Sequence, residues 1–489
     1  MKGILLIVLL WAGIKGGCGQ EMGGSAVQVP VSLEDCRRLA IESNKKLKMA
    51  EEQIRTAQAK RQEAFTKYLP GIDVMGVYMR NQKEINLLSE DAHLPVGTLG
   101  SDGNWTLRPD QVMTGADGKP VSVNGQYVPK DYALLPKEAM TVDDRNTAVL
   151  QVGLTQPIYM GGKIRAYHQI AGLSEKLAKS GRQQELQNII QETDEAYWQI
   201  VSLVNRRKLA LKYVETLKKF EHDIGVMYET GVSTKADLLS VKVKLNQAEM
   251  TLLKVEDGLS LSRMALNQIC GLPVDTVFML EEESLNVLPA GQPLEMRMEQ
   301  VYGNRPEIGS LSLATDIYKK KEKIARSAYL PTVAFMANYF AMAPSFFDGI
   351  GTKLDGMWSV GIGVKAPVFH WGASRKSVRS ARAETSQMSL KLEEAKEKIE
   401  LQVSQARFKV KEAERKMQMA QKNQEKADEN LKYADLGFQE GTIPVSNVLE
   451  AQTAWLSAHA DWIDSRIEMK LCEVYLQKAY GVLGEELKD

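Results

Sequence analysis

The chain contains one pattern twice, at a spacing of 210 residues. The stretch YETGVSTKADLLSVKVKLNQAE (residues 228–249) returns as FQEGTIPVSNVLEAQTAWLSAH (residues 438–459), with Gly231 and Gly441 in equivalent positions. A glycine between two segments of helical periodicity favours a left-handed helix cap, and a Ser or Thr just beyond it can start the next helix. The repeat therefore predicts two helical hairpins. Their second helices are expected to begin at Ser233 or Thr234 and at Thr442.

The arms of these hairpins are too long for a globular domain. Residues 162–229 and 372–439 are two uninterrupted helical stretches, and in the second the apolar or small side chains recur at steps of three and four, interrupted only at Gln424. A helix of about 67 residues is roughly 100 Å long. The returning helices, 236–270 and 446–480, are shorter and end before Gly271 and Gly481. Narrow apolar stripes of this kind require partners on either side of each helix rather than one deep core.

A helix and a strand precede each long helix. Helical periodicity over 33–67 ends at YLP (68–70), and over 294–328 it ends at a second YLP (329–331), an offset of 261. The 51 extra residues of the first half fall between its two strands, in the turn-rich stretch 80–146, which is expected to be a loop without a core. Each repeat then reads helix, strand, strand, long helix, tip, helix, with residues 20–290 forming the first repeat and 291–489 the second.

The strands alternate apolar with small or polar residues, as half-buried strands do. We expect Pro157 and Pro367 to close the second strand of each pair. About ten residues suffice for a tilted strand to cross a hydrocarbon layer, and four strands with open edges cannot close a pore in lipid. Several chains must then share one barrel, and a trimer would supply twelve strands. A soluble four-stranded sheet is the alternative. The expected membrane-facing residues are Val152, Leu154, Trp358, Val360, Ile362 and Val364.

The N-terminus has the form of a secretory signal. Residues 1–19 combine a charged start, an apolar stretch and a cluster of small residues. Cleavage after Gly19 is the favoured interpretation. Cys18 leaves open a lipoprotein signal, although Lys15 stands where such a signal normally carries Leu.

The composition argues against nucleic-acid binding and against catalysis. Lys plus Arg and Asp plus Glu both number 62, so the net charge is zero, and no basic stripe is interleaved with aromatics. Three cysteines remain after cleavage, at spacings that suit no metal site, and the five histidines are scattered. No nucleophile elbow or phosphate loop is present. We expect no enzyme activity, cofactor or metal.

Taken together, the motifs SLEDCRRLA, NKKL, YLP, VGLTQPIYMGGKIRA and YETGVSTKADLL, with their second copies, resemble the TolC family of outer-membrane efflux proteins. The resemblance covers nearly all of the mature chain. It implies a homotrimer in the outer membrane of a Gram-negative bacterium, with a twelve-stranded β-barrel and a long α-helical barrel crossing the periplasm. It also implies a periplasmic adaptor protein and an inner-membrane pump, in a tripartite efflux or type I secretion system that exports small molecules or proteins.

The resemblance also assigns the hairpin tips. It implies adaptor docking at the tip turns and an entrance aperture on the helices beside them. The aperture would include Asn447 and Glu450, of which only the second is acidic. Asp237 takes the place of a latching aspartate, but its expected polar partners are replaced by Phe438 and Ile443. Ordinary surface charge is the alternative for Asp237 and Glu450. The docking residues would be Gly231, Val232, Gly441 and Thr442.

Two functions from different classes remain open at this point. The first is a passive export duct driven by a partner protein. The second is a periplasm-spanning scaffold that anchors to the outer membrane without conducting. Paired short hairpins favour the duct, because an anchor needs only a lipid tail or one docking domain.

Overall fold

The computed structural model describes residues 31–101, 103–281, 295–347, 351 and 353–487. The predicted signal peptide with Cys18, and the predicted repeat boundary at residue 290, lie outside these residues. The chain divides into two compact units. A helical unit comprises residues 1–55, 176–313 and 390–489, and a strand unit comprises residues 56–175 and 314–389. Each unit takes residues from both repeats.

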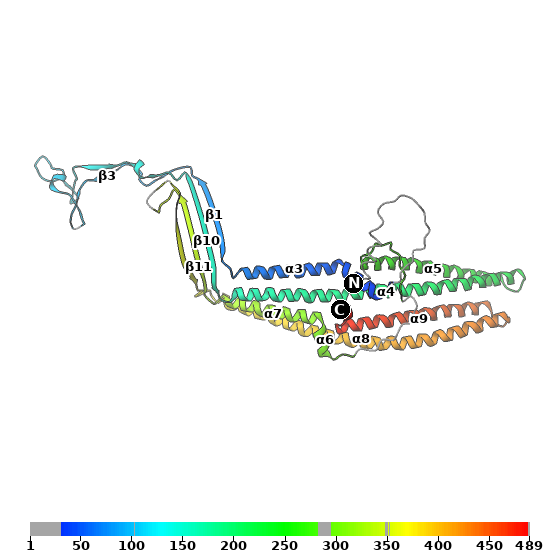
Figure 1. Ribbon diagram of the computed structural model, residues 1–489. Coiled ribbons are helices and arrows are strands. Elements are labelled where there is room, and N and C mark those ends of the chain that lie inside the picture. Colours follow the sequence, from blue (N-terminus) through cyan, green and yellow to red (C-terminus); the bar gives the residue numbers. More distant parts are fainter. Residues whose placement is uncertain (1–30, 102, 282–294, 348–350, 352, 488–489) are drawn as a thin grey trace, which may run out of the picture. The chain divides into compact units, whose positions relative to one another are not determined.

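The strand unit contains a four-stranded antiparallel sheet in the order β1-β10-β11-β12 (Figure 1). The strands are β1 (Gly71–Arg80), β10 (Asn146–Met160), β11 (Thr332–Ala343) and β12 (Asp355–Lys365). Each repeat contributes one hairpin, and β10 joins β11 across the repeats.

The register of this sheet places the apolar residues singled out in the sequence on one face, whereas the opposite face mixes polar, small and apolar residues such as Phe340 and Met357. Val152 pairs with Val74 and Tyr339, and Tyr339 pairs with Trp358. Because side chains alternate between the faces of a strand, Leu154, Val360, Ile362 and Val364 lie on the same face as these residues. One register line of the opposite face reads Asp73, Gly153, Asn338, Ser359.

The prediction that Pro157 closes its strand is wrong. Strand β10 continues to Met160, with a register shift against β11 between Pro157 and Tyr159. Pairing with β1 has already ended at Thr155. Pro157, which has no N–H to donate, therefore lies where the strand has lost one neighbour, and a bulge accommodates it. Its counterpart β12 does end before Pro367.

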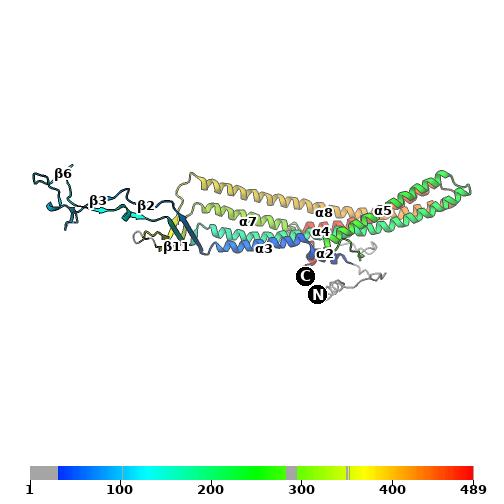
Figure 2. The ribbon, with the colours of Figure 1, turned by 90° about the horizontal axis from the view of Figure 1, so that it is seen from above.

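The insert between β1 and β10 is more ordered than a plain loop (Figure 2). It holds short two-stranded ladders, and Val112 and Val142 are buried within it. The expectation of a loop without a core was therefore only partly right. The ladders pair β2 (Ile85–Asn86) with β9 (Thr141–Val142), β3 (Ala92–Pro95) with β8 (Tyr132–Leu135), β4 (Thr98–Leu99) with β5 (Trp105–Thr106) and β6 (Ser122–Val123) with β7 (Gln126–Tyr127), beside short 3-10 turns Pro109–Gln111 and Lys137–Met140.

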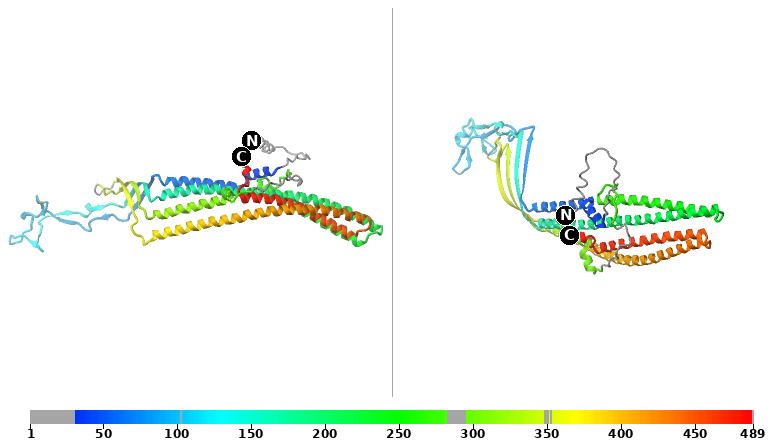
Figure 3. Two further views of the ribbon diagram at one scale, coloured as in Figure 1. Left: turned by 90° about the horizontal axis from the view of Figure 1, so that it is seen from below. Right: turned by 45° about the vertical axis from the view of Figure 1, so that its right-hand side comes forward.

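The predicted long hairpins are confirmed (Figure 3). Helices α4 (Lys163–Glu229) and α8 (Ala373–Gln439) each have 67 residues, and α5 (Lys235–Cys270) and α9 (Val445–Tyr480) each have 36. Gly271 and Gly481 cap the returning helices in the left-handed region, with φ of 71° and 80°. Within the described ranges, no helix combines the length and apolar character that crossing a membrane requires.

The two N-terminal helices of the repeats are broken, contrary to the expectation of continuous helices. In the first repeat, α2 (Leu33–Ser43) gives way to α3 (Lys45–Thr66) at Asn44, whose backbone is extended and whose side chain accepts a hydrogen bond from Lys46 N. In the second, α6 (Met298–Asn304) stops at Arg305, because Pro306 disfavours the helical conformation before it, and α7 (Pro306–Ser327) follows. A 3-10 turn, Glu485–Leu487, follows α9.

Within the helical unit, α4 and α9 lie between α5 and α8 (Figures 1 and 3). Ion pairs join α4 to α5 at Arg207 and Glu256, and α8 to α9 at Lys416 and Glu468. The apolar clusters indicate the same order of helices. One cluster near the tips contains buried residues of α4, α5 and α9, and in another cluster α8 packs on α9. Helices α5 and α8 are thus the edges of this layer.

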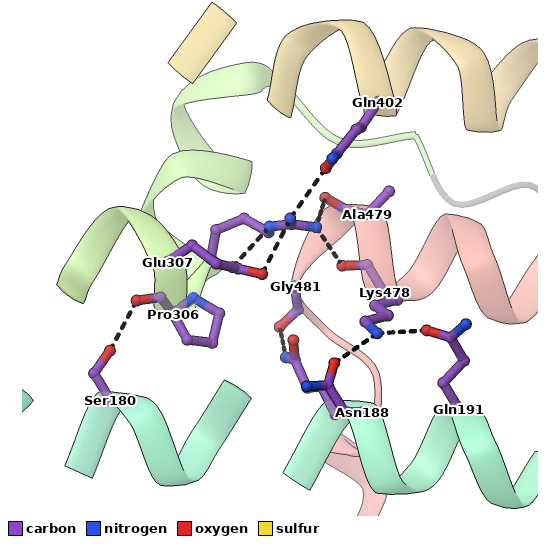
Figure 4. A network of polar contacts seen from close by, with 11 residues as sticks. Ser180, Asn188, Gln191, Pro306, Glu307, Gln402, Lys478, Ala479 and Gly481 are labelled. Carbon is purple, nitrogen blue, oxygen red and sulfur yellow. Dashed lines mark hydrogen bonds and ion pairs between the residues drawn. The ribbon is translucent and has the colours of Figure 1, made fainter. Parts of the chain in front are cut away.

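The broken helices satisfy the last carbonyls of α5 and α9, and Figure 4 shows the surroundings of Lys478 and Ala479 at the end of α9. Ser43 Oγ donates to Cys270 O at 2.7 Å. Arg305 Nη1 donates to Lys478 O at 2.9 Å and to Ala479 O at 3.2 Å. The last carbonyls of a helix have no intrahelical hydrogen-bond partners. Each break therefore supplies them with a donor from outside the helix.

A buried ion pair fastens α2 to α4. Arg37 Nε and Nη2 donate to the two carboxylate oxygens of Asp194 at 2.7 and 2.6 Å, and the Asp194 side chain is fully buried. Burial raises the pKa of Asp194, and the guanidinium opposes that rise. An isolated carboxylate here would be strongly unfavourable.

We predict that Arg37→Met lowers the unfolding free energy by about 3–5 kcal/mol, because Asp194 stays buried without its partner. The exposed pair Arg206–Asp464 is the matched control, and Arg206→Met should cost only about 0–1 kcal/mol. Denaturant unfolding followed by circular dichroism measures both.

The pH dependence gives an independent check of this assignment. Without Arg37 the pKa of Asp194 rises further, so Asp194 becomes protonated, and tolerates burial, as the pH falls from neutral. The decrease in unfolding free energy caused by Arg37→Met should therefore become smaller as the pH falls. A loss that is the same at all pH values would mean that packing, not charge, explains the role of Arg37.

Candidate functional site at the hairpin tips

The two tip turns have the same backbone form. Gly231 has φ of 80° and Gly441 φ of 73°, and nothing lies within 4 Å of a Cβ built on either residue. Val232 N donates to Met227 O, and Thr442 N donates to Gly437 O, each at 2.8 Å. These are the bonds of a left-handed helix cap. The glycines are thus required by backbone conformation rather than by lack of space.

Helix α5 begins with a capping box. Of the two predicted candidates, Thr234 is the N-cap and Ser233 is not. Thr234 Oγ1 accepts a hydrogen bond from Asp237 N at 3.1 Å, and the Asp237 carboxylate accepts one from Thr234 N at 3.2 Å. Ser233 Oγ also donates to this carboxylate, at 3.4 Å. In the described part of the chain, Asp237 bonds only within its own turn.

The prediction that Thr442 caps α9 is wrong. The N-cap is Pro444, which has no side-chain acceptor, and the Thr442 hydroxyl instead donates to Gly437 O at 2.9 Å. Thr442 therefore closes the end of α8. The second tip lacks the side-chain cap that the first tip has.

The residues in the latch positions pack in an apolar cluster. Phe438 meets Phe220 of α4 edge to face, with ring centroids 5.3 Å apart, and Ile443 packs against the same cluster. A Cβ on Gly437 would come within 2.6 Å of Ile443, so Gly437 allows this close approach. The tip hairpins are joined here by apolar contact.

Asn447 and Glu450 lie one turn apart on α9, and both are exposed. Val448 and Leu449 between them are buried against the other hairpin. Among the described residues Glu450 makes no ion pair, so its carboxylate faces solvent. The structure brings Gly441, Thr442, Ile443 and Phe438 together at one tip, while Asp237 belongs to the other hairpin.

A polar cluster farther from the tips was not predicted from the sequence. Trp455 Nε1 donates to Asp428 Oδ1 at 2.6 Å, and His459 Nε2 lies 2.9 Å from the same oxygen. The Lys212 ammonium lies over the Trp455 ring, 5.3 Å from its centroid. The spacing of Trp455 and His459, four residues on one helix, was the available signal.

Across the described ranges, no group of three or more His, Cys, Asp or Glu side chains could hold a metal ion. Cys36, Cys270 and Cys472 are buried thiols.

A family model for outer membrane efflux proteins matches residues 37–272 and 298–482, most of both repeats. The chain belongs to the outer membrane efflux protein family. Membership places this efflux protein in the outer membrane of a Gram-negative bacterium, from which it extends into the periplasm. No curated protein sequence matched the chain significantly.

Solved structures share the fold of this efflux protein at low sequence identity. One is CusC, with a TM-score of 0.71 and 14% identity over 95% of each chain. Another is the CmeC outer membrane channel of Campylobacter jejuni, with a TM-score of 0.70 and 15% sequence identity. The match covers 96% of this chain and 91% of CmeC. The outer membrane protein VceC of Vibrio cholerae has a TM-score of 0.67 and 16% sequence identity, and the match covers 92% of this chain and 96% of VceC.

We predict that Thr234→Ala loosens the first turn of α5 by about 1 kcal/mol, since it removes an N-cap acceptor. Hydrogen exchange of the amide of Asp237, which donates to Thr234, should accelerate about fivefold. Thr442→Ala is the matched control and should leave the first turn of α9 unchanged. Equal acceleration at both tips would contradict the assignment of a side-chain cap to the first tip alone.

Proposed function

We propose that three copies of this chain form a passive export duct through the outer membrane, as part of a tripartite efflux or type I secretion system. The observation that carries the proposal is the apolar surface on the edges of the helical unit. Small molecules and proteins are both candidate cargo.

The exposed apolar residues of the hairpin helices lie mainly on the two edge helices. Successive exposed apolar residues are 4, 7, 3, 8 and 3 positions apart on α5 and 11, 7, 11, 14 and 3 apart on α8. Each step is a sum of threes and fours, so each set lies along one side of its helix. Helix α9, which has neighbours on both sides, exposes no large apolar side chain in its fully described length. The exposed apolar residues are Leu239, Val243, Met250, Leu253, Leu261 and Met264 on α5, and Leu390, Leu401, Phe408, Met419, Tyr433 and Leu436 on α8.

Two such edges on one chain favour a closed ring of identical copies. If α8 of one copy packs on α5 of the next, every copy uses the same two surfaces, and a ring leaves neither edge exposed. The sheet supports the same arrangement. Strands β1 and β12 each have one neighbour, and unpaired strand edges are costly in lipid. Three copies would supply twelve strands, with the face of Val152, Leu154, Trp358, Val360, Ile362 and Val364 toward lipid.

The remaining parts of the chain suit the ends of such a duct. The insert 80–146 joins two strands at the end opposite the YLP junctions, and we assign it to the outside of the cell. The tip turns, with Gly231, exposed Val232, Gly441 and Thr442, would meet a periplasmic adaptor protein that links the duct to an inner-membrane pump. Gly231 and Gly441 expose backbone at the tips without a neighbouring side chain to shield it.

The rival proposal is a scaffold that spans the periplasm without conducting. It requires neither paired transmembrane hairpins nor an exposed acidic residue beside the tip. Purified protein in a planar lipid bilayer separates the two proposals, because the duct should give discrete channel conductance and the scaffold none.

We predict that Glu450 makes this conductance cation-selective, since a threefold axis would repeat its exposed carboxylate around the entrance. Glu450→Gln should reduce the cation preference several-fold while leaving the trimer intact. Glu429→Gln, on an exposed face of α8, is the matched control. An unchanged ion preference in Glu450→Gln would show that Glu450 does not line the aperture.

A further inference from the structure

The two repeats have the same register within their own strand hairpins. In the first repeat Gly71 pairs with Thr155, and in the second Thr332 pairs with Lys365. These pairs are equivalent, because the offset between the repeats is 261 residues before the insert and 210 after it. A register observed at one place in the sheet can therefore be transferred to the equivalent strands.

The contact between the repeats, β10 with β11, has no counterpart within one chain. Its counterpart would join β12 to β1, but these are the two edge strands, with β10 and β11 between them. Neighbouring strands are about 4.8 Å apart, so β12 and β1 of one chain are separated by about 14 Å. The missing contact therefore requires β12 of one copy and β1 of another.

The chain after β12 already has the backbone form of the paired strand. Strand β10 pairs with β11 as far as Met160, whereas β12 stops at Lys365, before the equivalent residue His370. The turn that follows is the same in both repeats, since Trp371 has φ of 49° and its counterpart Gly161 has φ of 61°. A bulky side chain in the left-handed region is strained. The second repeat thus keeps the path of the first at a cost.

The apolar residues beyond the end of β12 are more exposed than their counterparts in the first repeat. Val368 is 95% exposed and Phe369 68%, whereas Ile158 and Tyr159 are 59% and 44% exposed. Strand β11 covers part of the surface in the first repeat. An unpaired strand edge with apolar side chains favours the addition of another strand.

We propose that β12 of one copy pairs with β1 of the next copy in the register that β10 has with β11. Adding 210 to the β10 position and subtracting 261 from the β11 position converts the observed pair Val152–Tyr339 into Ile362–Tyr78. The pairing extends β12 to His370, past a bulge like the one in β10. This inference rests on the proposed ring of identical copies and specifies how two copies meet.

The faces of the strands agree with this register. Tyr78 lies on the same face of β1 as Val74, and Ile362 lies on the same face of β12 as Trp358, because side chains alternate along a strand. Val74 and Trp358 share one face of the sheet. The transferred register therefore continues that face from copy to copy, whereas a slip of one residue would join opposite faces.

Charge complementarity supports the same register. Lys365 would lie opposite Met75 of the next copy and diagonally across from Asp73, on the face opposite Tyr78. Diagonal neighbours are about 7–8 Å apart, within reach of a long side chain. Asp73 and Lys365 are both exposed, and within the described ranges neither forms an ion pair. The contact between copies would supply each with a partner of opposite charge.

The test is crosslinking of paired cysteines in the full-length protein in outer membranes. Ile362→Cys combined with Tyr78→Cys places two thiols directly opposite, with Cβ atoms about 5 Å apart. Gly76→Cys and Arg80→Cys, each combined with Ile362→Cys, are the matched controls, since both positions lie on the same face as Tyr78. A short bifunctional thiol reagent should link 362 to 78 several-fold faster than to 76 or 80, and denaturing gels should show covalently joined chains.

Charge reversal gives a second test that needs no cysteines. Asp73→Lys and Lys365→Asp should each lower the temperature at which the detergent-solubilised assembly dissociates. The double variant should recover most of this loss, because it restores the opposite charges across the contact. Far-UV circular dichroism checks that each variant keeps its helices.

The outcomes separate this inference from the proposed duct. Fastest linking at 76 or 80, or no linking at any of the three positions in protein that still conducts ions, would overturn the register and leave the duct intact. A double charge variant that dissociates as easily as the single variants would also overturn it. Linking at 78 in protein without conductance would support the register and contradict the duct.

Discussion

The constraint on which the rest of the structure depends is that helices of 67 residues must bury narrow apolar stripes. Helices this long have no deep core of their own, so every stripe requires another helix beside it. Within one chain this requirement is met for α4 and α9, which each lie between two neighbours. It is not met for α5 and α8, where Leu253 and Phe408 remain 60% and 67% exposed. The uncovered edges connect the fold of one chain to the assembly that we propose.

The two repeats meet the same local requirements with different residues. The last carbonyls of α5 receive a hydroxyl donor from Ser43, and those of α9 receive a guanidinium from Arg305. The helix after the first tip begins with a capping box, and the helix after the second begins at Pro444. Repeat symmetry thus preserves the backbone path and not the side chains that stabilise it. The two tips can therefore differ in stability and in partner contacts.

Local backbone chemistry explains which parts of the fold could be predicted from the sequence. Gly231, Gly441, Gly271 and Gly481 mark helix ends, because only glycine adopts the left-handed region without strain. Strand faces followed from alternation alone. The predictions were wrong where a residue is compatible with two different local structures. Pro157 could end a strand or occupy a bulge, and Thr442 could start one helix or close another.

The candidate site was less predictable than the fold. The tip turns follow from the repeat, but the roles of their side chains depend on which neighbours they meet in space. The capping role of Asp237 could have been inferred from its spacing to Thr234. The contact of Phe438 with Phe220 could not, because the two rings come from α8 and α4, more than 200 residues apart in the sequence.

The most direct test of the account is whether the edges of the helical unit are covered in the native membrane. Cysteines placed at Leu253 and Phe408 can be probed with a membrane-impermeant maleimide after the outer membrane is permeabilised, with Lys208→Cys on the exposed face of α4 as the control. The native thiols of Cys36, Cys270 and Cys472 are buried. The account predicts rapid labelling at position 208 and protection at 253 and 408 until the assembly is dissociated. Labelling of the edge positions as fast as the control would contradict it.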